Sequence, residues 1–333
     1  MKPVLALCLL LSSSILLSAQ ALHRTSDVKT EIEGPAIVLQ GGCDRDGNLY
    51  LRTNSRSGLE MPIQKLRADG ALTATFDPTA VFPYPDFRIR GYVPDGNGDL
   101  LVAGDVLRKD EEPSRFEYYL LRFSPTAELK DTTKIEAPPH KFTLYHFALF
   151  KTGEILLAGA DVSGTAQTAI YDAGGKFLRP IVLDDSETKQ IPGEVNFDVR
   201  NSVRQGAAVT GSDGNVYVLR SGNPAVVYGI SAAGQILHKL KIDLGDPALT
   251  PVNLLATGHA LAIVSRNSGE GHRFRGTVIH EIDFQGHVLA THDAVPGIPS
   301  SVSCYLAPGK FIVAETARGS KRSPPYLHMY RAE

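Results

Sequence analysis

The sequence predicts an all-β protein: a six-bladed β-propeller with four antiparallel strands per blade, whose ring is closed by the N-terminal strand joining the last blade. Three observations predict this fold. A turn glycine recurs at intervals of 44 to 61 residues. A second turn follows each of these glycines, and the apolar residues alternate or form short blocks without a helical period.

The recurring glycines stand directly before short β-rich segments. Asp46-Gly47-Asn48 precedes Leu49-Tyr50-Leu51, and Asp213-Gly214-Asn215 precedes Val216-Tyr217-Val218. Glycine and asparagine are typical of hairpin turns because such turns need positive φ angles. The same arrangement occurs at Gly47, Gly98, Gly153, Gly214, Gly258 and Gly309.

A second turn comes 20 to 28 residues after each of the first five, and a strand-like segment precedes it. Each unit therefore contains four strands joined by a tight turn, a longer loop and another tight turn, as in a propeller blade. An irregular β-sandwich is the alternative, which six units in a constant order disfavour. The second turns are Asp69-Gly70, Ser124-Pro125, Ala173-Gly174-Gly175, Ala233-Gly234 and Gln285-Gly286.

The two ends of the chain are predicted to meet. The sixth unit stops after residues 326–330 without a fourth strand, and residues 27–33 can supply it, which removes an exposed sheet edge. Cys43 and Cys304 precede the turn glycines of the first and sixth units by four and five residues, so both fall on innermost strands of neighbouring blades. A disulfide would lock the ring, and two separate buried thiols are the alternative.

The first 21 residues predict a secretory signal peptide. Lys2 precedes an apolar segment of about 14 residues, and Ala19 and Ala21 form an Ala-x-Ala cleavage site. A transmembrane anchor is the alternative, but it needs roughly 20 apolar residues. We therefore expect an exported protein, periplasmic or secreted after cleavage near Ala21, with one propeller domain over residues 22–333.

The charge balance favours no polyanionic partner. The chain has 34 basic and 36 acidic residues, with a formal net charge of −2 at pH 7. Neither nucleic acid nor an anionic membrane is indicated, and no later segment predicts a membrane span. We expect a monomer that takes a small-molecule, glycan or protein ligand at the channel mouth and needs no cofactor.

Two segments resemble a known repeat. Residues 41–51, Gly-Gly-Cys-Asp-Arg-Asp-Gly-Asn-Leu-Tyr-Leu, and residues 206–218 resemble the repeat of NHL-type propellers in the superfamily that also holds the TolB-like and gluconolactonase-like proteins. The other four units match loosely. This resemblance implies the propeller architecture and says almost nothing about activity, because the matching residues form a turn and a strand.

A further motif is similar to one family of that group. Glu33-Gly34-Pro35 resembles the Glu-Gly-Pro entry of the gluconolactonase-like propellers. The resemblance implies that Glu33 binds Ca²⁺ or another divalent metal at the top of the channel. It also implies an alternative function, a metal-dependent lactonase-like hydrolase or lyase acting on a sugar acid or lactone. A turn without a metal is the other interpretation of these residues.

Arginine is frequent in the linkers and outer loops that a propeller places on one face, where Arg52 also falls. Its planar guanidinium pairs with carboxylates or phosphates. We hypothesise a site for an anionic ligand, such as a uronate-bearing glycan, an organic acid or an acidic peptide. Solvated arginines paired with neighbouring acids are the alternative. The candidate residues are Arg88, Arg90, His146, Arg200, Arg204, Arg220 and Arg266.

The sequence contains no familiar catalytic motif. Gly-x-Ser-x-Gly, His-Glu-x-x-His and Cys-x-x-Cys are all absent from the chain. A propeller site collects residues from several blades, so its chemistry is not readable along one segment. A binding or interaction protein is therefore the favoured function, and the sequence leaves open whether the protein is an enzyme and which residues would be catalytic.

Overall fold

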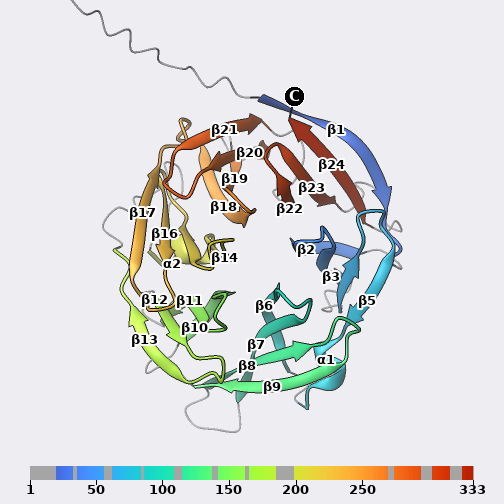
Figure 1. The fold of residues 1–333 in the computed structure, drawn as a ribbon, viewed down its shortest axis with the longest axis vertical. Helices are drawn as coiled ribbons and strands as arrows, with labels where there is room; N and C mark the ends of the chain where they lie inside the picture. The colour runs from blue at the N-terminus through green and yellow to red at the C-terminus, as the bar shows by residue number, and fades with distance from the viewer. Residues whose placement is uncertain are drawn as a thin grey trace, which may run out of the picture.

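The strands of the protein are arranged as sheets around a central axis (Figure 1). The computed structural model holds strands β1 to β24 and two short helices within the residues that it describes. The prediction of an all-β propeller is confirmed. The described residues are 20–32, 36–55, 62–83, 86–108, 115–136, 142–161, 165–184, 199–268, 274–293, 302–315 and 325–332.

Four sheets contain four strands each, consecutive in sequence and antiparallel to their neighbours. Short tight turns make this meander possible, because neighbouring strands can pair directly. The first sheet is β2 (Ala36–Cys43), β3 (Leu49–Ser55), β4 (Ile63–Leu66) and β5 (Leu72–Phe76); the second is β6 (Arg88–Pro94), β7 (Leu100–Arg108), β8 (Arg115–Phe123) and β9 (Leu129–Ile135). The third is β10 (Phe142–Leu149), β11 (Ile155–Asp161), β12 (Ala166–Tyr171) and β13 (Phe177–Ile181); the fourth is β14 (Ala207–Thr210), β15 (Val216–Arg220), β16 (Ala225–Ile230) and β17 (Ile236–Ile242).

The remaining strands form a single eight-stranded sheet in the order β18-β19-β20-β21-β1-β24-β23-β22. The prediction of six separate four-stranded blades is therefore wrong: the described residues form four such blades and this larger sheet. The strands are β1 (Gln20–Lys29), β18 (Leu249–Ala256), β19 (Leu261–Ser268), β20 (Phe274–Ile282), β21 (Val288–Asp293), β22 (Val302–Ala307), β23 (Lys310–Glu315) and β24 (Tyr326–Ala332).

The larger sheet exists because β1 pairs along both of its edges. It pairs antiparallel with β24 from Leu22 to Lys29, and parallel with β21 through Gln20 and Ala21. The N-terminal strand thus joins the last strand of the chain, but it begins earlier than the predicted residues 27–33. Gln20 and Ala21, which link the two groups of four strands, lie before the predicted cleavage point.

The turn residues explain the local order of strands. Gly47 has a φ of 80°, and the carboxylate of Asp44 accepts the backbone N–H groups of Asp46 and Asn48 at 3.0 and 2.9 Å. Asp95 accepts the N–H groups of its own turn in the same manner. These aspartates are therefore turn residues, as their spacing from glycine indicates.

The core consists of apolar layers between neighbouring sheets. Tyr50 and Phe76 of the first sheet lie with ring centroids 6.1 Å apart, and Phe76 meets Phe123 of the second sheet at 5.9 Å. Another layer joins the first sheet to β23 and β24 across the closure of the ring. Cys43 of β2 and Cys304 of β22 form a disulfide there, with their Cα atoms 5.4 Å apart.

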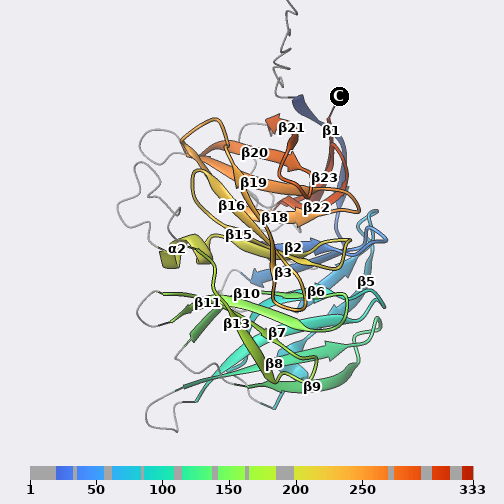
Figure 2. The same ribbon diagram turned by 60° about the vertical axis from the view of Figure 1, so that its left-hand side comes forward.

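Two short helices interrupt the strands. Helix α1 (Pro78–Val81) follows Asp77, whose carboxylate caps it by accepting the N–H groups of Thr79 and Ala80. Helix α2 (Val199–Arg204) immediately precedes β14 and packs against β11 and β15 (Figure 2). In the part of the chain that the structure describes, no helix is long and apolar enough to span a bilayer.

Candidate functional site: a cavity on the axis of the ring

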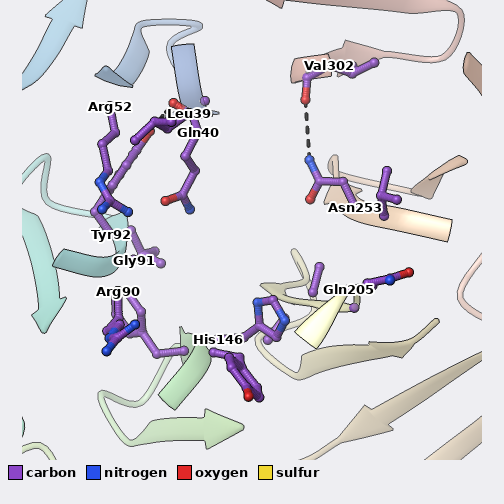
Figure 3. Close-up of a pocket in the computed structure, with 18 of the residues that line it drawn as sticks. Leu39, Gln40, Arg52, Arg90, Gly91, Tyr92, His146, Gln205, Asn253 and Val302 are labelled. Atoms are coloured by element: carbon purple, nitrogen blue, oxygen red, sulfur yellow. Dashed lines mark hydrogen bonds between the residues drawn. The ribbon is translucent and has the colours of Figure 1, made fainter. Parts of the chain in front are cut away.

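A cavity of about 760 Å³ lies between the innermost strands of the sheets (Figure 3). Its volume falls within the range of about 300–1,000 Å³ that is typical of small-molecule sites. Every sheet contributes to its wall, since the lining residues come from β2, β3, β6, β10, β14, β18, β22 and β23. The cavity is therefore enclosed by the inner strands of all the sheets.

β-Bulges shape this wall. In five innermost strands the pairing with the next strand skips single residues, once in four of them and twice in β22, so that these residues have no partner across the ladder. A bulge bends its strand and redirects the extra side chain, and bulges are common beside functional sites. The extra residues are Leu39 in β2, Arg90 in β6, Tyr145 in β10, Val252 in β18, and Ser303 and Leu306 in β22.

Three of the bulges occupy equivalent places in the repeat. Leu39, Arg90 and Tyr145 each precede the turn glycine of their unit by eight residues. All three line the cavity, and Val252 does so too. Strand β14 has no bulge, and the residue at the same spacing in its unit, Gly206, also lines the cavity. At this one structural position, three repeats thus present different side chains to the cavity, those of Leu39, Arg90 and Tyr145.

Two arginines from neighbouring sheets occupy the same part of the wall. Arg52 comes from β3 and Arg90 from β6, and Figure 3 shows both on one side of the cavity. Burial lowers the pKa of Arg52 below its usual range, and the nearby charge of Arg90 acts in the same direction. The Tyr92 hydroxyl stabilises this wall by donating to the backbone carbonyl of Tyr50 at 2.7 Å, with the carbonyl of Gln40 as a second acceptor at 3.0 Å.

A buried carboxylate holds Arg90. Asp105 of β7 is only 1% exposed and accepts a hydrogen bond from Nε of Arg90, while Oδ1 of Asp105 has no hydrogen-bond partner among the described residues. The Arg90 side chain is 26% exposed. Because Nε is engaged, the two terminal nitrogens of this guanidinium are the donors left for a ligand.

Helix α2 brings Arg204 to the cavity. Nε2 of His146 in β10 donates to the backbone carbonyl of Val203 at 2.7 Å, and burial lowers the pKa of this histidine. Arg220 is 2% exposed and donates to Oγ of Ser202 at 3.1 and 2.7 Å. Two side chains from different sheets thus fix the helix that carries Arg204 into the lining.

The structure brings together only part of the predicted set. Arg90, His146 and Arg204 line the cavity, whereas Arg88 lies over the ring of Phe116 at 5.9 Å and does not line it. Arg220 has a structural role beneath α2, and Arg266 is exposed outside the cavity. The side chain of Arg200 and the whole of Glu33 lie outside the described residues.

Several lining residues carry no signal in the sequence. Gln40 of β2, Asn253 of β18 and Gln205, which lies between α2 and β14, contribute side-chain amides (Figure 3). In the sequence, only their spacing from the turn glycine indicates that they lie at the channel. Asparagine and glutamine are also common on protein surfaces, so the residue type itself is no signal of a site. The charged residues of the lining are Arg52, Arg90, Arg204 and Glu315.

The described residues contain no group of three or more His, Cys, Asp or Glu side chains that could hold a metal ion. Glu315 instead lies 3.4 Å from Nε2 of His328. Because Glu33 lies outside the described part of the chain, its assignment as a metal ligand, and the lactonase-like activity that depends on it, stay predictions.

Comparisons with known proteins agree with the fold. No protein-family model and no curated protein sequence matches the chain. Among solved structures, the WD40 domain of Pan2 from Neurospora crassa is similar with a TM-score of 0.50 and 9% identity, covering 95% of this chain and 96% of that one. A protein of unknown function from Bacteroides caccae has a TM-score of 0.49 and 12% identity, over 83% and 94% of the two chains.

A third structure, YCF48 bound to a D1 peptide, has a TM-score of 0.41 and 11% identity, over 95% of this chain and 98% of that one. At such identities the likeness concerns the fold and not the ligand. The protein is therefore a β-propeller with a cavity on its axis, and its resemblance to the NHL-type or gluconolactonase-like members stays a prediction.

Proposed function

We propose that this propeller is a binding protein for an anionic ligand, which it holds in the axial cavity through Arg52 and Arg90. The observation that carries the proposal is the placement of these two arginines on the same side of the cavity (Figure 3). Burial is the main cause of the lowered pKa of Arg52, and repulsion by the positive charge of Arg90 adds to it. A carboxylate or phosphate between them would relieve this repulsion.

The surroundings favour such a contact. Hydrogen bonds between arginine and an ionised oxygen are about twice as strong as neutral ones, and partly buried pairs are less screened by salt than surface pairs. Asp105 fixes Arg90 before a ligand arrives, so less side-chain freedom is lost on binding.

Titration calorimetry with D-galacturonate, and with neutral galactose as the matched sugar, tests the proposal. Galacturonate should bind and galactose should bind at least 10-fold more weakly, with affinity falling as salt is added. Arg52→Gln and Arg90→Gln should each weaken galacturonate binding by about 10- to 100-fold, as expected for loss of a charge-assisted contact worth ~1.5–3 kcal/mol. Arg266→Gln, outside the cavity, is the control. Equal affinity of the two sugars, or binding unchanged in both cavity variants, would contradict the proposal.

We also propose that the protein works outside the cytoplasm. The basic start, the short apolar segment and the Ala19-x-Ala21 site support export, and disulfides such as Cys43–Cys304 are common in oxidising compartments. Mass spectrometry of the protein from the culture medium or periplasm should give a chain beginning near Leu22. A full-length chain confined to the cytoplasm would refute this.

A further inference from the structure

We infer that the cavity has a second anion subsite at Arg204, and that the ligand is an acidic oligosaccharide whose carboxylates reach both subsites. This inference rests on the proposed function and extends it from a single anionic group to a ligand of defined length. Its basis is the position of Arg204, the size of the cavity and the chemistry of the side chains between the two subsites, Arg204 on one side and Arg52 with Arg90 on the other.

Arg204 lies apart from the other two arginines. It belongs to α2 before the fourth sheet, whereas Arg52 and Arg90 belong to the first and second sheets. Figure 3 places Gln205, the next residue in the chain, across the cavity from Arg52 and Arg90. The Arg204 side chain is exposed and forms no ion pair with any residue that the structure describes. It is thus an available cation on the far side of the cavity.

The helix that carries Arg204 is anchored, so the position is defined. His146 holds the Val203 carbonyl and Arg220 holds the Ser202 hydroxyl, one and two residues before Arg204. The anchoring keeps Arg204 at a constant separation from the Arg52–Arg90 wall.

One small anion would leave most of the cavity to water. The volume is about 760 Å³, and one water molecule occupies about 30 Å³ in the liquid. A ligand that contacts both subsites must span the cavity, and it must carry an anionic group at each end. An organic acid with one carboxylate can contact only one of the two subsites.

Uncharged polar groups line the space between the subsites. The side-chain amides of Gln40 and Gln205 form no hydrogen bond within the described part of the chain. An amide both donates and accepts, which suits sugar hydroxyls that do the same. Tyr145, the bulge residue of β10, adds an aromatic ring and Val252 an apolar side chain for the C–H faces of sugar rings. An oligomer of uronic acids presents all of these groups in one chain.

The test measures affinity against chain length. D-Galacturonate and its dimer and trimer are titrated into the protein and into Arg204→Gln, Arg90→Gln and Arg266→Gln variants. In the unmodified protein the trimer should bind at least 10-fold more tightly than the monomer. Arg204→Gln should abolish this gain, so that the trimer and the monomer bind with similar affinity, whereas Arg90→Gln should weaken every length and Arg266→Gln should change neither affinity. Arg204 is exposed, and an unchanged melting temperature will show that its variant is folded.

The outcomes separate this inference from the proposed function. If the monomer binds but the trimer binds no better, or if Arg204→Gln keeps the length dependence, the second subsite is refuted and the anion site at Arg52 and Arg90 stands. If no galacturonate binds, the inference and the proposed function are both overturned. If triglutamate binds more tightly than trigalacturonate, the ligand is an acidic peptide and the assignment to a saccharide is wrong.

Discussion

The disulfide between Cys43 and Cys304 should supply a large part of the stability of this protein. The two residues are 261 positions apart, so their bond restricts almost the whole unfolded chain. Loop-closure entropy for a ring of that length corresponds to about 5–6 kcal/mol at 25 °C. We therefore expect a Cys43→Ala, Cys304→Ala double variant to lose about 5 kcal/mol of unfolding free energy.

The measurement is urea unfolding followed by circular dichroism. With an m value of about 3 kcal/mol/M, the midpoint should fall by roughly 1.7 M. Alanine also removes two sulfur atoms, one of them from Cys304, which is completely buried. The same unfolding experiment on the unmodified protein reduced with a phosphine therefore serves as the matched control, since it breaks the bond without changing the packing residues.

The reduced protein and the double variant should agree to within about 1–2 kcal/mol, the cost of small core truncations. A loss below about 1 kcal/mol in both would refute the reasoning, because it would mean that the disulfide does not restrict the unfolded chain as the loop-closure argument assumes. A large loss in the double variant alone would assign the stability to packing of the sulfur atoms.

Three further predictions concern single positions. Gly41→Ala should destabilise the protein by about 1–3 kcal/mol because its Cβ would overlap Ser303, and Ser303→Gly should restore part of this in thermal unfolding of the double variant. Burial lowers the pKa of His146 in the folded state, so below about pH 6.5 the unfolded state binds a proton that the folded state does not. The unfolding free energy should therefore fall from pH 7 to 5 by at most about 1.4 kcal/mol per pH unit. His146→Gln, which keeps an N–H donor, should reduce that slope, and an unchanged slope would contradict this. Arg220→Met should cost about 1–3 kcal/mol and speed amide hydrogen exchange in α2, with unaltered exchange there arguing against the anchoring role.

The order of strands could be predicted from the sequence because turns are local signals. Gly47 and its equivalents need positive φ, and this need is visible in the residue type and spacing. The joining of the last eight strands was not predictable in this way. It depends on Gln20 pairing with His292 at the other end of the chain, and Gln20 falls within the segment whose composition indicates a signal peptide.

The candidate site was less accessible to sequence reasoning, for a physical reason. Arg88 and Arg90 are two residues apart on one strand, and regular alternation puts such residues on the same face. The bulge at Arg90 breaks the alternation, so Arg90 lines the cavity and Arg88 does not. The different positions of Arg88 and Arg90 result from the strand pairing, and the residue types alone do not reveal this difference.

The bulges also bear on how this protein could acquire a new ligand. A residue that is skipped by the ladder carries few of the pairing constraints that hold a regular strand residue in place. Leu39, Tyr145 and Val252 can therefore be exchanged with little effect on the strand pairing, while each exchange alters the cavity wall directly. Arg90 is different, because its exchange would leave the buried carboxylate of Asp105 without its partner. A library randomised at the other three codons would sample many cavity chemistries on an unchanged scaffold. Natural variation among homologues should be concentrated at the same three codons, even where the surrounding strands are constant.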